Sequence, residues 1–393
     1  MKNELKLVVC LATVLSAPAF AQREALSLEP VIDRTALDGA SIAYVYVSSS
    51  PTSGGNNEVE AFAVSATGKL TPVPGSPFQE NVTSMAVNGK YLFAANANGF
   101  DIDSYLMESD GALKYKTSLN AANSEDCNFL GPLFLDKTGS TLYDMDFNGS
   151  DCSGNTYESF TFNKANAHLA PLNDSGPNSW LNLPASFTGN NQYAYSAVCI
   201  GNMYWGIYGF KRESNGLLSQ ADISATPPTP PSGYFYCPSQ AAADPANHVA
   251  ITMQPVNQQT FNPDKSAQLA TFTAAPNGNL STSSTAANMP ETLVGSVTDL
   301  KMAPSGKLLA VAGTGGLQIF HFNGGSPIKG YTGLLTTDEI DQSFWDSENH
   351  LYAISRTAGK LFVFTITPTG YHEATGSPYS IAHPQNIIVQ PKS

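Results

Sequence analysis

The sequence predicts an all-β protein, a seven-bladed β-propeller with four-stranded blades. Three observations carry this prediction: a composition typical of short strands and turns, two motifs that each recur seven times, and chain ends that look like complementary parts of one blade. The 393 residues include 32 Gly and 26 Pro, with 10% aromatic and only 13% charged residues. This chain has too few charges for a coiled coil and too many apolar residues for a disordered segment.

The first motif is an apolar residue followed three positions later by Phe or Tyr. In most copies a turn with Gly follows, or with Asn in the third copy, and then an apolar residue. Glycine suits such turns because it adopts positive φ without strain. The copies lie about 43 to 62 residues apart, at residues 59–62, 102–105, 157–160, 207–210, 269–272, 317–320 and 361–364.

The second motif is a short run of aliphatic and aromatic residues about 10 to 20 positions before each copy of the first. The runs lie at 43–47, 91–94, 142–145, 193–195, 249–251, 308–311 and 351–354. Another apolar run precedes the turn before several of them, as at 133–135 and 300–302. Each unit therefore holds about four short strands over roughly 40 to 60 residues, the period of a propeller blade.

The two ends of the chain complete each other. The first unit begins near Ile42 without an inner strand, and NIIVQP at 386–391 resembles an inner strand without a blade. Joined to the run at 42–47, this segment matches the continuous pair of runs at 299–313. We therefore expect the C-terminal strand to close the N-terminal blade, which leaves no open sheet edge in the ring. An open array of β-sandwiches is the alternative, but it does not explain the complementary ends, so residues 42–391 are expected to form one domain.

The first 21 residues are predicted to be a signal peptide. Two lysines precede a short apolar run at 7–15, and a small-x-small cleavage sequence stands at 19–21. A membrane anchor is the alternative, but the run is much shorter than the ~20 residues that a span needs, and no later segment approaches that length. We expect an exported protein, periplasmic or extracellular, with a mature chain from Gln22 and a polar leader over 22–41.

Four cysteines remain after the signal peptide, which allows three pairings. In a propeller, the entries of the inner strands and the loops from second to third strands lie on one face, and all four cysteines fall at such places. We predict Cys127–Cys152 within a blade and Cys199–Cys237 between neighbouring blades. Each bridge would contribute about 3–4 kcal/mol. Free thiols are the alternative, which an oxidising compartment disfavours.

Two segments resemble a known family. YLFAAN at 91–96 and GKLTPVPGSPF at 68–78 are similar to the lactonase-type seven-bladed β-propellers, which include phosphogluconolactonase-like and YVTN-repeat proteins. The Gly-Ser-Pro-aromatic element returns at 376–379, and the resemblance covers nearly all of 42–391. It implies the propeller fold and, as one activity found on that fold, lactone hydrolysis. The lactonases often carry a Pro-His pair at the entry of inner strands, whereas this chain has the reverse order at residues 383–384.

The face that carries the cysteines is also where we expect a ligand site. His383 or Asp341 is the candidate base toward water, and Arg356 is the candidate to stabilise the oxyanion of an attacked lactone carbonyl. Further ligand contacts are expected from loop residues on the same face, Glu125, Trp180, Tyr236, Asp299 and Gln385. Ordinary solvated loop residues are the alternative interpretation of all eight.

Several classes of ligand are not expected. The net charge of −13 argues against nucleic acid, which attracts positive surfaces. The cysteines have no C-x-x-C spacing, so no metal site is predicted. Residues 144–149 resemble the start of a calcium loop, but position twelve is Asn155 and the run leaves a strand, which favours a polar blade edge. The glycines at 313–316 do not lie between a strand and a helix, so no nucleotide and no other cofactor is expected.

The sequence therefore predicts a monomeric, exported module that binds a small molecule or a protein at the funnel around the ring axis. A lactonase-like hydrolase that opens a sugar-type lactone ring is the alternative.

Overall fold

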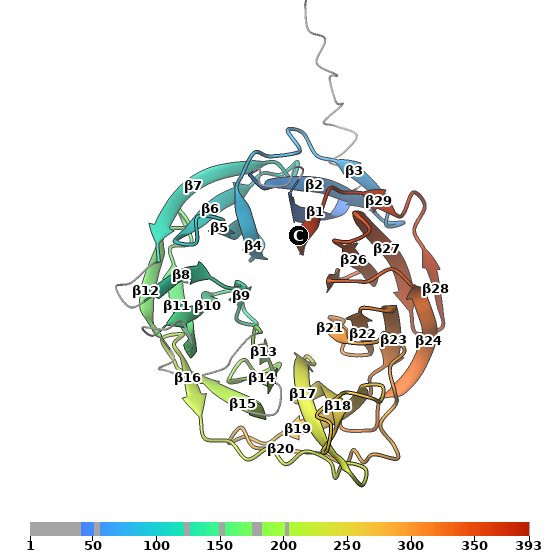
Figure 1. The fold of residues 1–393 in the computed structure, drawn as a ribbon. Coiled ribbons are helices and arrows are strands. Elements are labelled where there is room, and N and C mark those ends of the chain that lie inside the picture. The colour runs from blue at the N-terminus through green and yellow to red at the C-terminus, as the bar shows by residue number, and fades with distance from the viewer. Residues whose placement is uncertain are drawn as a thin grey trace, which may run out of the picture. The chain divides into compact units, whose positions relative to one another are not determined.

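A computed structural model of the chain shows seven antiparallel sheets arranged around one axis (Figure 1). It describes residues 41–50, 56–121, 126–148, 154–174, 183–200 and 204–392. Within these ranges the regular secondary structure is all β, and no helix there is long and apolar enough to cross a membrane. The all-β seven-bladed propeller predicted from the sequence is confirmed.

Each sheet is one blade, and we number the blades along the chain. Blade 1 has the strand order β30-β1-β2-β3, blade 2 runs from β4 to β7, blade 3 from β8 to β12, blade 4 from β13 to β16, blade 5 from β17 to β20, blade 6 from β21 to β24 and blade 7 from β25 to β29. The inner strands, nearest the axis, are β30 (Pro384–Pro391), β4 (Val82–Val87), β8 (Asp126–Leu130), β13 (Ser186–Phe187), β17 (Tyr234–Ala243), β21 (Val297–Met302) and β25 (Gln342–Trp345). In blade 3 the short β9 (Phe134–Leu135) continues the inner edge and pairs with β10.

The other strands follow outward. The second strands are β1 (Ser41–Ser49), β5 (Tyr91–Asn96), β10 (Thr141–Asn148), β14 (Tyr193–Ile200), β18 (His248–Asn257), β22 (Leu308–Gly313) and β26 (His350–Ser355). The third strands are β2 (Glu58–Ser65), β6 (Asp101–Met107), β11 (Gly154–Phe162), β15 (Tyr204–Arg212), β19 (Gln268–Ala274), β23 (Gly316–His321) and β27 (Lys360–Thr367). The outer strands are β3 (Leu70–Pro72), β7 (Leu113–Asn120), β12 (Leu169–Asp174), β16 (Leu218–Ala221), β20 (Leu280–Ser281), β24 (Lys329–Thr336) and β28 (Gly370–Glu373), and β29 (Tyr379–Ser380) pairs with β27.

The ring closes as the chain ends predict. β30 pairs antiparallel with β1, from Ala43 opposite Pro391 to Ser49 opposite Pro384. The last strand therefore supplies the inner strand of blade 1, and the colours at the two ends of the chain meet in that blade in Figure 1. Because the backbone groups of β1 are paired on both sides, this blade has the same four strands as its neighbours.

The aromatic residue of the first motif lies on the third strand in every blade. These seven side chains are 0% to 7% exposed and belong to the apolar clusters that fill the blades and the spaces between them. Burying one such ring contributes about 1.5–3 kcal/mol. The first motif therefore recurs in the sequence because each blade needs this aromatic residue in its apolar core.

The turn after the motif contacts the preceding blade. The Tyr195 hydroxyl, on the second strand of blade 4, donates to the carbonyl oxygen of Gly278 in blade 5 at 2.8 Å. Gly278 has φ of +87°, and a Cβ there would lie 2.5 Å from the Tyr193 ring, so the close approach requires glycine. The same contact joins Tyr46 to Gly111 at 2.9 Å and Tyr143 to Gly216 at 2.8 Å.

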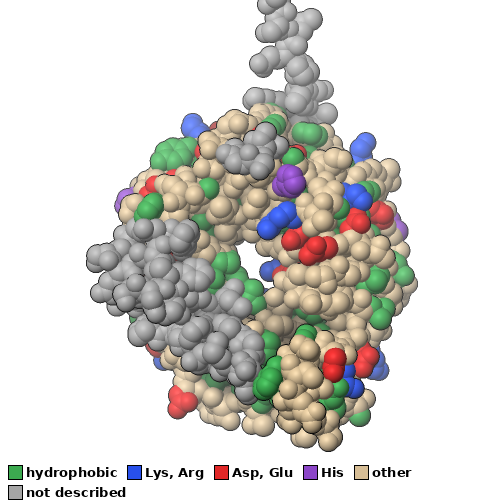
Figure 2. Space-filling view, in the orientation of Figure 1, with side chains coloured by type: hydrophobic (Ala, Val, Ile, Leu, Met, Phe, Trp, Pro, Cys, Tyr) green, Lys and Arg blue, Asp and Glu red, His purple; other side chains and the backbone are tan. Residues whose placement is uncertain are grey.

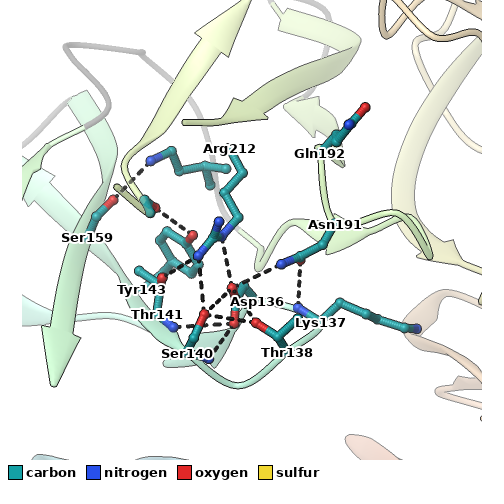
Figure 3. Close-up of polar contacts among 12 residues, drawn as sticks. Asp136, Lys137, Thr138, Ser140, Thr141, Tyr143, Ser159, Asn191, Gln192 and Arg212 are labelled. Carbon is teal, nitrogen blue, oxygen red and sulfur yellow. Dashed lines mark hydrogen bonds and ion pairs between the residues drawn. The ribbon is translucent and has the colours of Figure 1, made fainter. Parts of the chain in front are cut away.

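A buried ion pair joins blades 3 and 4 (Figure 3). Asp136, just after β9, lies 2.8 Å from Nε of Arg212 on β15. The Asp136 carboxylate also accepts hydrogen bonds from Asn191 Nδ2 at 3.0 Å, from the backbone N–H of Ser140 at 2.6 Å and from the Ser140 hydroxyl at 2.8 Å. Burial alone would raise the pKa of Asp136, but these hydrogen bonds and the Arg212 charge together lower the pKa.

Candidate functional site

The candidate site is a cavity of about 450 Å³ around the ring axis. It lies at the face where the chain enters the inner strands and where second strands turn into third strands, which we call the entry face. All seven blades contribute lining residues: Gln385 and Asn386, Thr83 and Ser84, Leu130 to Pro132, Leu183 and Pro184, Gln240 and Ala241, Thr298 to Lys301, and Asp341, Gln342 and Arg356. We call this space the entry cavity. Because residues of all seven blades line it, the entry cavity lies on the ring axis.

One position recurs around the entry cavity, four residues before the turn into the second strand in blades 2 to 7 and at the matching place of β30 in blade 1. At five blades its side chain hydrogen-bonds the backbone of the next blade's inner segment. Ser84 accepts from Leu133 N at 2.9 Å, Asp299 from Ser343 N at 2.8 Å, Gln342 from Ile387 N at 2.9 Å and Asn386 from Met85 N at 3.0 Å, while Gln240 donates to Thr298 O at 2.9 Å. The other two positions are Pro132 and Pro184. These contacts fix neighbouring blades to one another, so the cavity wall is pre-formed.

Asp299 and Lys301 form the charged part of blade 6 in the cavity. Asp299 is 7% exposed, and its Oδ2 accepts both the backbone N–H and the hydroxyl of Ser343 at 2.8 Å. Its other oxygen, Oδ1, lies 3.5 Å from Lys301 Nζ. The Lys301 side chain is 36% exposed, so its ammonium remains accessible to a ligand while the Asp299 carboxylate is held by the blade interface.

Asp341 and Arg356 stand together on blade 7. Asp341 Oδ2 accepts the backbone N–H of Arg356 at 2.7 Å, which ties the loop after β26 to the entry of β25. In the part of the chain that the structure describes, no carboxylate lies within ion-pair distance of the Arg356 guanidinium. Charged side chains of both signs border the opening near the axis in Figure 2, over blades 6 and 7. An accessible, unpaired guanidinium is well suited to bind a carboxylate or phosphate.

Four predicted site residues thus line one cavity, namely Asp299, Asp341, Arg356 and Gln385. Gln385, at the start of β30, makes no side-chain hydrogen bond with any described residue, so its amide is available to a ligand. The cavity therefore offers cationic donors, carboxylate acceptors and an amide within one small volume.

His383 is not brought into this group. It is exposed, precedes β30 with φ of +46°, and does not line the entry cavity. Its carbonyl oxygen accepts the backbone N–H of Ser50 at 3.3 Å. Because the chain turns at this residue before the strand begins, the alternation of the strand does not aim its side chain at the axis.

Tyr236 is not at the funnel either. Its side chain is 4% exposed and packs in the core of blade 5, and its hydroxyl donates to Gln268 Oε1 at 2.7 Å. Burial raises the pKa of the Tyr236 hydroxyl. The register of β17 shifts between Pro238 and Ala241, so residues before and after this irregularity do not share one alternation, and Gln240 rather than Tyr236 lines the cavity.

The remaining predictions on this face divide in two. The disulfide Cys199–Cys237 is present, with a Cα–Cα distance of 5.2 Å, and joins β14 to β17. Glu125, Trp180 and the bridge Cys127–Cys152 lie outside the described residues, or depend on side chains that do. Among the residues described, no group of three or more His, Cys, Asp or Glu side chains could hold a metal ion.

Gln240, Lys301 and Asn386 are among the lining residues that were not predicted from the sequence. Gln240 and Asn386 occupy the recurring position, so aligning the inner strands of the seven units would have found them. Lys301 is the only basic residue in the seven inner strands as described, a signal visible once the strands are assigned.

Comparisons with known proteins place the fold. No family model and no curated protein matches the sequence. Solved structures match over most of the chain. A candidate 6-phosphogluconolactonase from Bacteroides uniformis matches with a TM-score of 0.63 and 13% identity, over 89% of this chain and 99% of that one. A second candidate 6-phosphogluconolactonase, from Bacteroides fragilis, matches with a TM-score of 0.61 and 12% identity, over 89% of this chain and 98% of that one. The periplasmic gluconolactonase of Pseudomonas aeruginosa matches with a TM-score of 0.63 and 14% identity, over 90% of this chain and 100% of that one.

At these identities the likeness concerns the fold. The chain has the fold of the lactonase-like seven-bladed β-propellers, as its sequence motifs predict.

Proposed function

We propose that the protein binds a small polyhydroxylated carboxylate in the entry cavity. The observation that carries this proposal is the Arg356 guanidinium, which has no carboxylate partner among the described residues and lines a pre-formed cavity on the ring axis. A volume of about 450 Å³ suits a sugar-acid-sized molecule, since small-molecule sites commonly enclose about 300–1,000 Å³.

The chemistry of the lining supports this class of ligand. A guanidinium pairs with a carboxylate through two parallel hydrogen bonds, and Lys301 adds a second positive charge. Asp341 Oδ1 can accept hydrogen bonds from ligand hydroxyls, and the Gln385 amide can both donate and accept. An apolar ligand would leave these groups without partners, which is unfavourable.

Isothermal titration calorimetry with gluconate and with the uncharged polyol sorbitol tests the proposal. We expect gluconate to bind and sorbitol to bind at least ten-fold more weakly. Arg356→Ala should weaken gluconate binding at least ten-fold, whereas Lys307→Ala, at an exposed turn on the opposite face, should leave it unchanged. Equal affinity for the two ligands, or no effect of Arg356→Ala, would contradict the proposal.

Lactone hydrolysis is the second candidate function. It is favoured by the names of the solved neighbours, two candidate 6-phosphogluconolactonases and a gluconolactonase, and by the proximity of Asp341 to Arg356. In this role Asp341 takes a proton from the attacking water, and Arg356 stabilises the negative charge that develops on the carbonyl oxygen. The ring oxygen then leaves with a proton and the product is a hydroxy acid.

The hydrolysis of δ-gluconolactone, followed in a pH-stat against the spontaneous rate, tests this role. An enzyme should exceed the spontaneous rate and lose at least a hundred-fold of its activity in Asp341→Asn. If gluconate binds but the lactone is hydrolysed only at the spontaneous rate, the protein is a binding module.

We also propose that the protein is exported and monomeric. The Cys199–Cys237 bridge supports export, because disulfides persist in oxidising compartments. Cell fractionation should find a mature chain beginning at Gln22 outside the cytoplasm, and light scattering should give the mass of one chain. A full-length chain in the cytoplasm would contradict the export proposal, and a dimer mass the monomer proposal.

A further inference from the structure

The wall of the entry cavity differs in character from one side of the ring to the other. Its charged side chains all come from blades 6 and 7, and the available amide of Gln385 comes from blade 1. Blades 3 and 4 contribute only apolar residues and a glycine, each partly exposed: Leu130, Gly131, Pro132, Leu183 and Pro184. We call these five residues the apolar wall. Over the cavity as a whole, apolar atoms supply more of the exposed lining than polar atoms do.

The apolar wall lies across the ring axis from Arg356. In a ring of seven blades, blades 3 and 4 are each three steps from blade 7, one in either direction, so their junction is opposite the blade that carries Arg356. In Figure 1, β9 of blade 3 lies across the central opening from β26 of blade 7. A ligand that pairs with Arg356 and extends across the cavity therefore meets the apolar wall.

The apolar wall interrupts the pattern of the recurring position. Five blades hold a side chain there that hydrogen-bonds the next blade, whereas blades 3 and 4 hold Pro132 and Pro184. Proline has no N–H, and its side chain consists of CH₂ groups. The Leu183 carbonyl oxygen already accepts the hydroxyls of Tyr157 and Ser196. The side chains of the apolar wall thus offer a ligand no hydrogen bond.

The polar side chains next to the apolar wall, on blade 2, are already engaged. The Thr83 hydroxyl donates to the Ala95 carbonyl oxygen at 3.3 Å, and the Ser84 hydroxyl accepts the backbone N–H of Leu133 at 2.9 Å. A ligand hydroxyl pressed against this side of the cavity would lose its hydrogen bonds to water without replacement, which is unfavourable. An apolar group in the same place gains from leaving water.

We propose that the ligand of the entry cavity is amphiphilic, a uronic acid whose far end carries an apolar group, as in a glucuronide of an aromatic alcohol. The carboxylate pairs with Arg356, the sugar hydroxyls face Asp341 and Gln385, and the apolar group lies against the apolar wall. This inference rests on the proposed function, because Arg356 holds the carboxylate, and it adds the class of substituent that the ligand carries.

Isothermal titration calorimetry with the full-length folded protein compares phenyl β-D-glucuronide with methyl β-D-glucuronide, which has the same acid and no ring. We expect the phenyl compound to bind at least ten-fold more tightly, because its ring leaves water at the apolar wall. Its binding should also have the more negative heat-capacity change. Phenyl β-D-glucoside, which has the ring but no carboxylate, should bind at least ten-fold more weakly than phenyl β-D-glucuronide.

Variants of the apolar wall locate the ring. Leu183→Asn should reduce the preference for the phenyl over the methyl compound at least three-fold and leave the affinity for the methyl compound unchanged. Pro132→Ser, on the blade 3 side, is a second variant with the same expected result. Leu293→Asn is the matched control and should change nothing, since Leu293 is 58% exposed and does not line the cavity. Circular dichroism of each variant checks that it is folded.

The outcomes separate this inference from the proposed function. If Arg356→Ala weakens the binding of both glucuronides but the phenyl compound binds no more tightly than the methyl compound, the apolar substituent is refuted and the carboxylate site stands. The inference is also overturned if Leu183→Asn and Pro132→Ser both keep the full preference, because the ring then lies elsewhere, or if gluconate binds and neither glucuronide does. If Arg356→Ala changes the affinity for neither glucuronide, the inference and the proposed function both fail.

Discussion

Removing the Asp136 carboxylate should destabilise the ring at the junction of blades 3 and 4. Asp136→Ala leaves Arg212, 17% exposed, without its anion, and leaves the Ser140 N–H without its acceptor. Breaking a buried ion pair from one side costs about 3–5 kcal/mol, and an unsatisfied buried N–H about 1–3 kcal/mol. Because Arg212 keeps some contact with water, we take the lower end of each and expect a loss of about 4 kcal/mol.

Urea unfolding at pH 7, followed by tryptophan fluorescence, measures this loss as a lower midpoint at unchanged slope. Asp136→Asn, which keeps an acceptor but no charge, should lose about 2 kcal/mol, and the exposed Asp264→Ala should change stability by less than about 0.5 kcal/mol. The double variant Asp136→Ala, Arg212→Met should lose about 2 kcal/mol less than the sum of its single variants. The reasoning is refuted if the losses simply add, or if Asp136→Ala costs less than about 1 kcal/mol.

Asp136 also makes the free energy of unfolding depend on pH, in a direction that follows from its lowered pKa. Its pKa is lowered in the folded protein, so the folded chain binds fewer protons there than the unfolded chain. This stabilisation is complete above the ordinary aspartate pKa of about 4 and is lost as the pH falls through the lowered value. The stability gap between the unmodified protein and Asp136→Asn should therefore stay constant from about pH 7 to pH 5 and narrow below about pH 4.

Three further predictions concern the ring. Gly278→Ala should lower the free energy of unfolding by more than about 2 kcal/mol, because the new Cβ would overlap the neighbouring blade. Gly233→Ala, at a residue with φ of +81° and open space around it, should lower the free energy of unfolding by about 1 kcal/mol. Equal losses of the two variants in urea unfolding would contradict this reasoning. Replacing Cys199 and Cys237 by Ser should cost about 4 kcal/mol for a separation of 38 residues, and a reductant should then lower the stability of the unmodified protein alone. Burial and a neighbouring glutamate raise the pKa of Glu60 to about 7, so its charged form is unfavourable in the folded protein. After allowance for its partial exposure, Glu60→Gln should raise the free energy of unfolding by about 1 kcal/mol at pH 8 and leave it unchanged at pH 4. A gain in stability at both pH values would contradict this reasoning.

The fold could be predicted because every blade is packed by the same kinds of residue at the same positions. An aromatic residue on the third strand fills the core, and a positive-φ turn lets the preceding blade approach, so both leave a regular trace in the sequence. The split blade was visible for the same reason, since NIIVQP fits the pattern of an inner strand and needs the partner that β1 provides.

The site could be predicted only in part, because local irregularities decide which side chain reaches the axis. Asp341 and Arg356 were found since each lies one residue outside a regular strand, where position in the blade defines the face. Tyr236 packs in the core instead of lining the funnel, since the register shift in β17 cannot be read from alternation. His383 precedes its strand with a positive φ, which is uncommon outside glycine, and does not line the cavity.

A crystal structure of the protein soaked with gluconate tests the central claim most directly. The account predicts the carboxylate within hydrogen-bond distance of the Arg356 guanidinium, with ligand hydroxyls facing Asp341 inside the entry cavity. Gluconate bound away from the ring axis, or an empty entry cavity at a concentration that saturates binding in solution, would contradict it.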